Sequence, residues 1–191
     1  MKVLIIDNGT SYLAQLKKLL SNCEAEVVSY LDIPPLRSME QFDAVILSGG
    51  HNFPVIGNES RLEREMSLIK NINKPVFGIC YGFELIASVY GAKLEEMQEK
   101  EKGILDIEAV GDDIMRNIPN FKVFESHRWV VKEIGEEFVV LAKSKDGIEA
   151  IKHKTRPIYG VQFHPEMFLE KTCGDEIFKN FLNLCRVSSL S

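Results

Sequence analysis

Short apolar runs that alternate with helix-like segments dominate the first half of the chain. Near-continuous apolar runs of this kind are typical of strands that are buried on both faces of a parallel sheet. Between two of the runs, Leu62, Met66 and Ile69 recur at the spacing of one helix face. The alternation predicts an α/β fold with an open mixed, mostly parallel sheet flanked by helices, as in flavodoxin-like domains. The predicted parallel strands span residues 2–7, 25–30, 42–47 and 75–79.

The second half of the chain has a different pattern. Strand-like runs follow one another at short spacing, which predicts antiparallel hairpins added to the parallel sheet. Charged residues fill positions 95–102, where we expect a solvated loop or the end of a helix. A last amphipathic helix is predicted at residues 175–185. The predicted hairpin strands span residues 104–110, 121–125, 138–143, 147–152 and 158–163.

Length and composition fit one globular domain. The chain has 191 residues, of which 45% are hydrophobic and 27% charged, enough to bury a core without disulfides or metal ions. The sequence contains no repeat, low-complexity tract or linker. We therefore predict a single domain at residues 1–186, followed by a frayed tail at residues 187–191.

Charge, hydrophobicity and cysteine spacing exclude several functions. The net charge is −5 and no run of Lys or Arg stands out, which disfavours nucleic acid and anionic membranes as partners. No apolar stretch is long enough to span a bilayer and no signal peptide precedes the first strand, so a cytoplasmic location is expected. No CxxC pair is present, and neither a metal nor a cofactor is predicted in this chain. Cys23, Cys173 and Cys185 are expected to be buried free thiols.

Cys80 has a different setting, between a predicted strand and a predicted helix. Gly78 and Gly82 lie two residues before and two residues after it. Small residues at these positions allow the sharp strand-to-helix turn of a nucleophile elbow, although the pattern can also arise by chance near a turn. Such a turn places the thiol at the carboxyl ends of the strands and at a helix N-terminus, which favours the thiolate. Cys80 is therefore predicted to be a nucleophile.

A thiol nucleophile needs a base, and the base needs a group that orients it. His164 and Glu166 follow the predicted strand at residues 158–163, so they too should emerge at a strand end. His164 would accept the thiol proton, and Glu166 would hold the imidazole in the correct tautomer. A lone His near a Glu is more often an ordinary surface pair, and we interpret His51 and His153 in that way. The elbow at Cys80 favours a catalytic triad.

Two adjacent glycines end the predicted strand at residues 42–47, after Ser48. Glycine allows backbone N–H groups to approach a ligand closely. We predict that the amides of Gly50 and Tyr81 form an oxyanion hole beside Cys80. A phosphate-binding loop is the alternative, but neither the Asp-Ser pair of a pyrophosphatase loop nor a Walker lysine follows.

Together these motifs resemble the class I (triad) glutamine amidotransferases over essentially the whole chain. The resemblance implies a central mixed sheet flanked by helices and a triad of Cys80, His164 and Glu166. It also implies that the backbone around Ser126 and His127 contacts the carboxylate of glutamine. The segments that carry it are Asp7-Asn8-Gly9, Ser48-Gly49-Gly50, Gly78-Ile79-Cys80-Tyr81-Gly82, Glu125-Ser126-His127 and Tyr159-Gly160-Val161-Gln162-Phe163-His164-Pro165-Glu166.

Within this family, the sequence is most similar to the glutaminase subunits of GMP synthases, particularly the stand-alone archaeal form. This resemblance implies that ammonia from glutamine passes to a separate GMP synthetase (ATP-pyrophosphatase) subunit, which aminates XMP. ATP and Mg²⁺ would bind that partner, in a heterodimer or larger assembly. The alternatives are an amidotransferase of another pathway, a γ-glutamyl hydrolase with the same triad, or a non-catalytic protein of related topology.

The sequence departs from the family pattern at four positions, the first of which is Phe83, where the family commonly has histidine. Glu84 replaces the glutamine that commonly holds the amino-acid end of the substrate, and we expect its carboxylate to pair with the α-ammonium group. Trp129 stands where GMP synthases usually have Asp, and His51 stands where proline usually follows the glycines. Residues 51–55 and 128–130 are candidates for the partner surface, although core packing is an equal alternative for Trp129.

Overall fold

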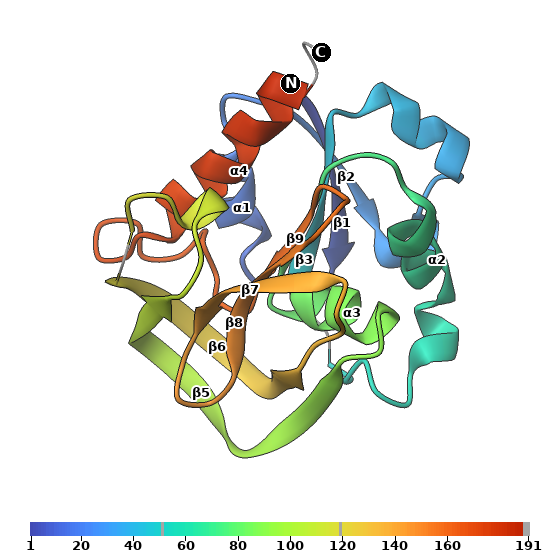
Figure 1. Cartoon of the computed structure of the whole chain (residues 1–191). Coiled ribbons are helices and arrows are strands. Elements are labelled where there is room, and N and C mark those ends of the chain that lie inside the picture. Colours follow the sequence, from blue (N-terminus) through green and yellow to red (C-terminus); the bar gives the residue numbers. More distant parts are fainter. Residues whose placement is uncertain (51, 119, 189–191) are drawn as a thin grey trace.

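The computed structural model describes residues 1–50, 52–118 and 120–188 of the chain, and the side chains of residues 187 and 188 are not described. In this part, one mixed sheet of nine strands is covered by helices on both faces (Figure 1). The strand order is β2-β1-β3-β4-β9-β8-β6-β5-β7, and β7 also pairs with β8. The α/β class is confirmed. No helix of the described ranges is both long enough and apolar enough to cross a membrane.

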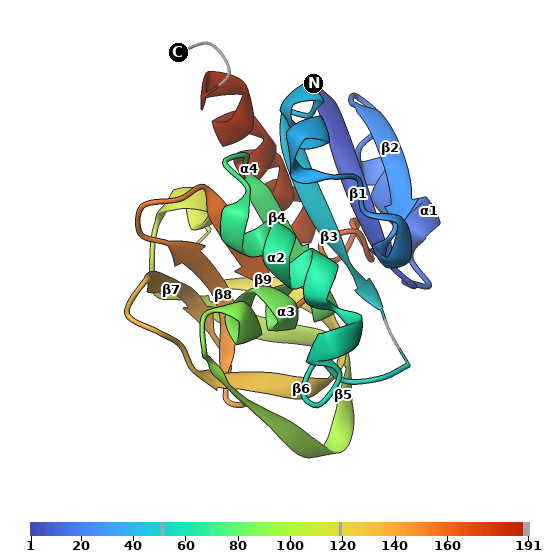
Figure 2. The ribbon, with the colours of Figure 1, turned by 90° about the vertical axis from the view of Figure 1, so that its right-hand side faces the viewer.

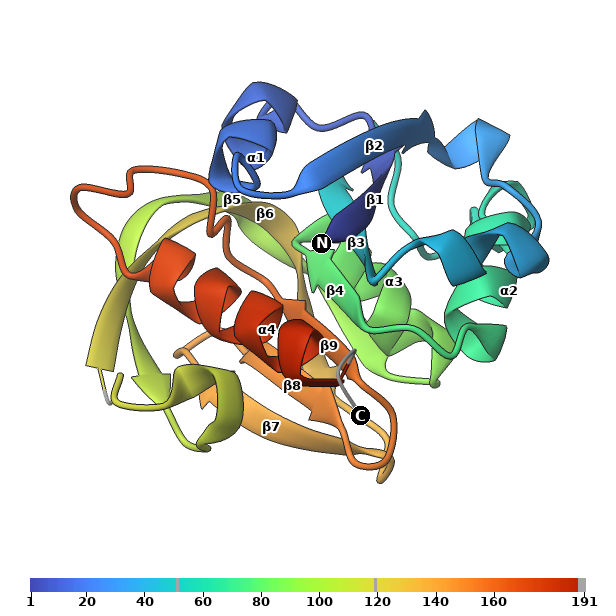
Figure 3. The same ribbon diagram turned by 90° about the horizontal axis from the view of Figure 1, so that it is seen from above.

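Five strands form a parallel half of the sheet. Side chains alternate between its faces, so that Val3 and Ile5 pack on one side and Leu4 and Ile6 on the other. The first side is covered by α1 and α4 and the second by α2 and α3 (Figures 2 and 3). The parallel strands are β1 (Lys2–Asn8), β2 (Glu24–Ser29), β3 (Ala44–Gly50), β4 (Val76–Ile79) and β9 (Ile158–Val161).

Three helices, α2, α3 and α4, lie close to the predicted positions around residues 62–69, after Cys80 and at residues 175–185. The last helix is longer than expected and includes residues 187 and 188 of the predicted tail, whose remaining residues lie outside the described ranges. The α-helices are α1 (Leu13–Leu19), α2 (Glu63–Asn71), α3 (Tyr81–Val89) and α4 (Gly174–Ser188). Short 3₁₀ turns occupy Tyr30–Asp32, Leu36–Gln41, Glu59–Arg61 and Asp113–Met115.

The other four strands are antiparallel and close on themselves. These are β5 (Lys93–Ala109), β6 (Asn120–Glu133), β7 (Phe138–Lys143) and β8 (Ile148–His153). β6 pairs with β5 and β8, and β7 joins β8 to the end of β5, so that the four strands enclose a small barrel-like unit. The prediction of an open, mostly parallel sheet was therefore wrong in this half. β9, expected in a hairpin, lies between the halves, parallel to β4 and antiparallel to β8.

The charged segment 95–102 is part of a strand rather than a loop or helix end. It lies in β5, where Glu95 pairs with Val130 and Glu101 pairs with His127 of β6. β5 pairs only with β6 over this stretch and most of its side chains here are exposed, so charged residues are tolerated. β6 likewise continues beyond its predicted end at Glu125 and includes residues 128–130.

Gly82 is required by the packing of α3 against β3. A Cβ atom at this position would lie 2.4 Å from the carbonyl oxygen of Leu47, a backbone atom that cannot move aside. We expect Gly82→Ala to lower the free energy of unfolding by about 1–3 kcal/mol, as other overpacked cores do. Urea denaturation measures this loss. Gly103→Ala is the matched control, because a Cβ there meets nothing within 4 Å; equal stability of the two variants would contradict the packing argument.

Candidate active site

Cys80 lies at a sharp turn between β4 and α3. Its backbone has φ 49° and ψ −101°, a conformation that is strained for a residue with a side chain. The turn brings Gly78 so close to Gly82 that a Cβ on Gly78 would lie 2.6 Å from the Gly82 carbonyl. Hydrogen bonds from the Cys80 amide to the Val161 oxygen and from the Glu84 amide to the Cys80 oxygen hold the turn. The predicted elbow geometry is confirmed.

His164 and Glu166 form a buried pair beside this turn. Nδ1 of His164 lies 2.9 Å from Oε1 of Glu166, and both side chains are almost fully buried. Because a carboxylate only accepts, Nδ1 carries the proton and Nε2 presents a lone pair, which is the tautomer of a general base. Tyr12 packs edge-on against the imidazole with ring centroids 4.9 Å apart.

Gly49 shows how close the imidazole and the cysteine are. A Cβ on Gly49 would lie 2.8 Å from Cε1 of His164 and 3.5 Å from Cβ of Cys80. Both side chains therefore border the same small space, and both line one cavity of about 230 Å³. The fold brings Cys80, His164 and Glu166 together.

The thiol of Cys80 is held in its neutral form. Sγ lies 4.0 Å from the Ser126 carbonyl oxygen and 3.9 Å from Nε2 of Gln162. Burial raises the pKa of Cys80, and the carboxylates of Glu84, Glu125 and Glu166 raise it further. The Tyr81 amide lowers the pKa, as expected at a helix N-terminus, but burial outweighs it. The thiol needs a base to become a nucleophile.

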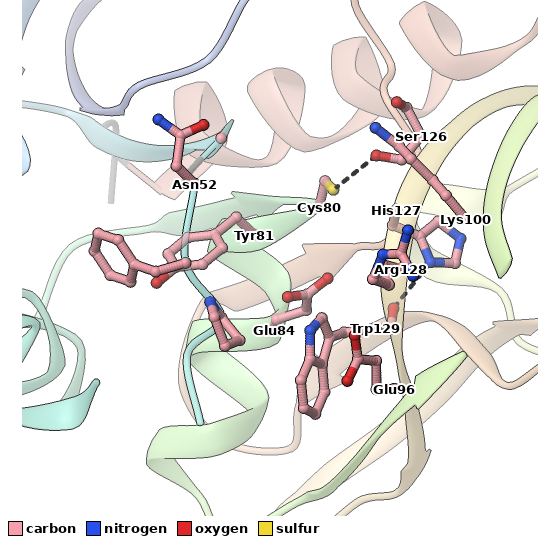
Figure 4. Close-up of a pocket in the computed structure, with 13 residues that line it drawn as sticks. Asn52, Cys80, Tyr81, Glu84, Glu96, Lys100, Ser126, His127, Arg128 and Trp129 are labelled. Carbon is pink, nitrogen blue, oxygen red and sulfur yellow. Dashed lines mark hydrogen bonds between the residues drawn. The ribbon is translucent and has the colours of Figure 1, made fainter. Parts of the chain in front are cut away.

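Gly50 and Tyr81 border a second cavity at Cys80. This cavity has a volume of about 370 Å³ and also contains Glu84, Ser126 and His127 (Figure 4). Gly50 has φ 140°, and a Cβ there would lie 2.2 Å from the carbonyl oxygen of Asn8. Only glycine fits this position, so the backbone of the predicted oxyanion loop can lie directly at the cavity.

A network of buried hydrogen bonds holds the backbone next to Gly50. The Asn8 amide donates to Oγ of Ser48 at 2.8 Å, and Nδ2 of Asn8 donates to the Ser48 oxygen and to Oε1 of Glu65 at 3.2 and 3.0 Å. Burial raises the pKa of Glu65 to about 7. Sequence reasoning missed Glu65, since a carboxylate on an amphipathic helix is usually exposed.

Glu84 faces the larger cavity from the first turn of α3. It is buried, and Nε2 of Gln162 donates to its Oε1 at 3.0 Å. Burial raises the pKa of Glu84 to about 7, while the Gln162 hydrogen bond and His127 lower it. Sequence reasoning placed Gln162 in a motif but gave it no role; the structure shows that it joins Glu84 to the thiol.

His127 is anchored by groups behind the cavity wall. Nδ1 lies 2.8 Å from the Trp129 carbonyl oxygen, and Nε2 lies 3.2 Å from the buried carboxyl group of Glu125. Burial raises the pKa of Glu125 to about 8. The pKa of Glu149 is raised well above its ordinary value by burial and by the nearby charge of Glu125. Two buried acids thus surround an imidazole that the sequence suggested only as a backbone contact.

The remaining predicted residues lie as follows. Trp129 is half-buried and lines the larger cavity, so it belongs to the site wall rather than to the core. His153 accepts hydrogen bonds from the backbone of Thr155 and Arg156, which is a structural role. His51 lies outside the described residues. Cys185 is buried, whereas Cys23 and Cys173 are only partly buried. No cluster of three or more candidate metal ligands occurs among residues 1–50, 52–118 and 120–188.

The sequence matches the family model "Glutamine amidotransferase class-I" over residues 4–184. This chain belongs to the class-I glutamine amidotransferases. It is 35% identical to a glutamine-hydrolysing GMP synthase subunit of Pyrococcus abyssi, over 96% of this chain and 98% of that protein. It is 34% identical to the glutamine-hydrolysing GMP synthase subunit of Sulfolobus acidocaldarius, over 97% of this chain and 100% of that protein.

Solved structures agree with this assignment. A putative GMP synthase subunit from Thermoplasma acidophilum superposes with a TM-score of 0.88 at 27% identity, covering 99% of this chain and 96% of that one. A glutamine amidotransferase from Thermotoga maritima gives 0.73 at 20% identity, covering 98% of this chain and 83% of that one. The second likeness concerns the fold alone. The closed antiparallel half is thus part of an amidotransferase domain.

Burial of Glu84 predicts a pH dependence of stability in this amidotransferase. The pKa of Glu84 rises from 4.5 to about 7 on folding, so the native state binds more protons than the unfolded state between these values. The stability of the wild type relative to Glu84→Gln should therefore fall as the pH rises from 4.5 to 7, by up to about 3 kcal/mol. Urea denaturation across this range measures it. A difference that is constant or increases with pH would contradict an ionisable, buried Glu84.

Proposed function

We propose that this chain hydrolyses glutamine to glutamate and ammonia with a Cys80–His164–Glu166 triad. The observation that carries the proposal is the strained elbow at Cys80, which shares a cavity with the His164–Glu166 pair. Membership of the class-I amidotransferases supports the same chemistry.

The proposed reaction begins when Nε2 of His164 accepts the thiol proton of Cys80. The sulfur attacks the side-chain amide carbon of glutamine, and the resulting oxyanion accepts hydrogen bonds from the amides of Gly50 and Tyr81. Such donors typically contribute about 2.7–4 kcal/mol each to lowering the barrier. The imidazolium, stabilised by Glu166, gives its proton to the departing ammonia. His164 then activates water, which releases glutamate from the thioester.

The amino-acid end of glutamine would lie in the larger cavity. Glu84 offers a carboxylate to the α-ammonium group, and the backbone around Ser126 and His127 lies beside the α-carboxylate. Glu84 is well suited to this role because, among the described residues, Gln162 is the one side chain that donates a hydrogen bond to it, through Oε1, which leaves the second oxygen for the substrate.

We further propose that the ammonia serves a separate GMP synthetase subunit that aminates XMP in the cytoplasm, in a heterodimer or larger assembly. Relatives that match nearly full length are named as subunits of glutamine-hydrolysing GMP synthases. The triad needs no cofactor, and ATP and Mg²⁺ would be bound by the synthetase. The raised pKa of the Cys80 thiol supports the idea that glutamine hydrolysis is slow in the chain alone and is activated by the partner, because the thiolate is the nucleophile.

Reconstitution tests this proposal. We expect the wild type, mixed with an archaeal GMP synthetase subunit, XMP, ATP and Mg²⁺, to form GMP from glutamine. Cys80→Ala should abolish the glutamine-dependent rate and leave the ammonia-dependent rate unchanged, because the synthetase itself is intact. Cys173→Ala is the control and should keep both rates.

Two results would contradict the proposal in different ways. Glutamine-dependent GMP formation by Cys80→Ala would contradict the triad. Hydrolysis of glutamine by the wild type without any GMP formation would retain the triad but exclude this acceptor, in favour of an amidotransferase of another pathway or a γ-glutamyl hydrolase.

A further inference from the structure

The two cavities described above meet at the thiol. The larger one extends toward Glu84 and Trp129, and the smaller one extends toward Tyr12 and His164. The smaller cavity thus lies on the side of the base and the larger one on the side proposed for the amino-acid head. The residues that line both are Gly50, Asn52, Cys80, Lys100 and Ser126.

Among the residues that the structure describes, Lys100 is the member of this shared set with a charged side chain. It lies on β5, in a break of the strand register between Glu96, which pairs with Trp129, and Glu101, which pairs with His127. Residues 97–100 of β5 therefore face a single β6 residue, Arg128. Extra residues in one strand redirect side chains, and here the bulge brings Lys100 next to Ser126 at the cavity wall (Figure 4).

The surroundings of the thiol are negative. Glu84 and Glu96 line the larger cavity, and Glu84, Glu125 and Glu166 act on the thiol. Glutamine brings a further carboxylate into this site, which requires a cation or hydrogen-bond donors to offset the repulsion. Backbone groups near Ser126 supply hydrogen bonds but no net charge.

The Lys100 ammonium is available for this task. Within the described ranges it makes neither an ion pair nor a hydrogen bond, whereas several other lysines are paired. Arg128 also lines the larger cavity but not the smaller one, so of these two cations Lys100 is the one that borders both cavities. Glu84, on α3, lies on another side of the cavity from Lys100 (Figure 4).

We propose that Lys100 binds the α-carboxylate of glutamine beside Ser126, opposite the α-ammonium group held by Glu84. The proposal rests on the glutaminase function above and adds a specificity determinant that the family motifs do not contain. Lys100 restricts the site to γ-amides that carry a free α-carboxylate. It takes no part in the chemistry at Cys80.

Alkylation of Cys80 by two reagents, in the reconstituted complex with the GMP synthetase subunit, tests this assignment. The diazoketone 6-diazo-5-oxo-L-norleucine carries the amino-acid head of glutamine, whereas iodoacetamide carries no head. Loss of a charge-assisted contact should slow labelling of Lys100→Met by the diazoketone about tenfold or more. Its iodoacetamide rate should equal that of the wild type. Lys100→Arg should label at close to the wild-type rate, and mass spectrometry of the Cys80 peptide measures all rates.

Lys102→Met is the matched control, because Lys102 lies on the same strand, is exposed and lines neither cavity. It should label like the wild type with both reagents. Equal diazoketone rates for Lys100→Met and the wild type would overturn the assignment, as would a parallel loss with iodoacetamide, which would place Lys100 at the reacting atoms. If wild-type Cys80 in the reconstituted complex reacts with iodoacetamide but resists the diazoketone, the proposed glutaminase function itself is wrong.

Discussion

The strained backbone of Cys80 is the constraint on which the rest of the site depends. Conformations of this kind cost about 1–3 kcal/mol and persist only where the surrounding packing enforces them. Here the enforcement comes from α3, whose residues Phe83, Leu85 and Ile86 are fully buried. One turn of this helix then places the thiol, the Tyr81 amide and the Glu84 carboxyl around the same cavity. The packing that buries α3 in the core therefore also fixes the geometry of the site.

Burial and the charged groups around Cys80 determine the protonation state of its thiol in the unliganded chain. Buried acids surround the thiol and raise its pKa, so the unliganded chain holds a neutral sulfur. Two of these acids are themselves poorly solvated, and burial raises the pKa of Glu84 to about 7 and that of Glu125 to about 8. Substrate or partner binding that brings positive charge or removes water shifts this balance. Such an arrangement is consistent with the proposal that the glutaminase activity depends on a partner subunit.

Local sequence patterns predicted the proposed catalytic residues. The features that depend on contacts between distant parts of the chain were not predicted. The elbow at Cys80 and the pair of His164 and Glu166 are each encoded within a few residues at a strand end. In contrast, closure of the antiparallel half depends on β7, which forms a hairpin with β8, also pairing with the distant strand β5, and no local pattern records that second pairing. The charged strand at residues 95–102 escaped prediction because its charges face solvent. Glu65 escaped because burial of an acid depends on tertiary packing.

The most direct test of this account is to trap the acyl-enzyme. The reconstituted complex would be mixed with isotope-labelled glutamine, quenched in acid within one turnover, and digested for mass spectrometry. We predict a γ-glutamyl group on the Cys80 peptide, which disappears on treatment with hydroxylamine as a thioester should. Formation of labelled glutamate without any acylated Cys80, or acylation of another residue, would contradict a nucleophile positioned by the elbow.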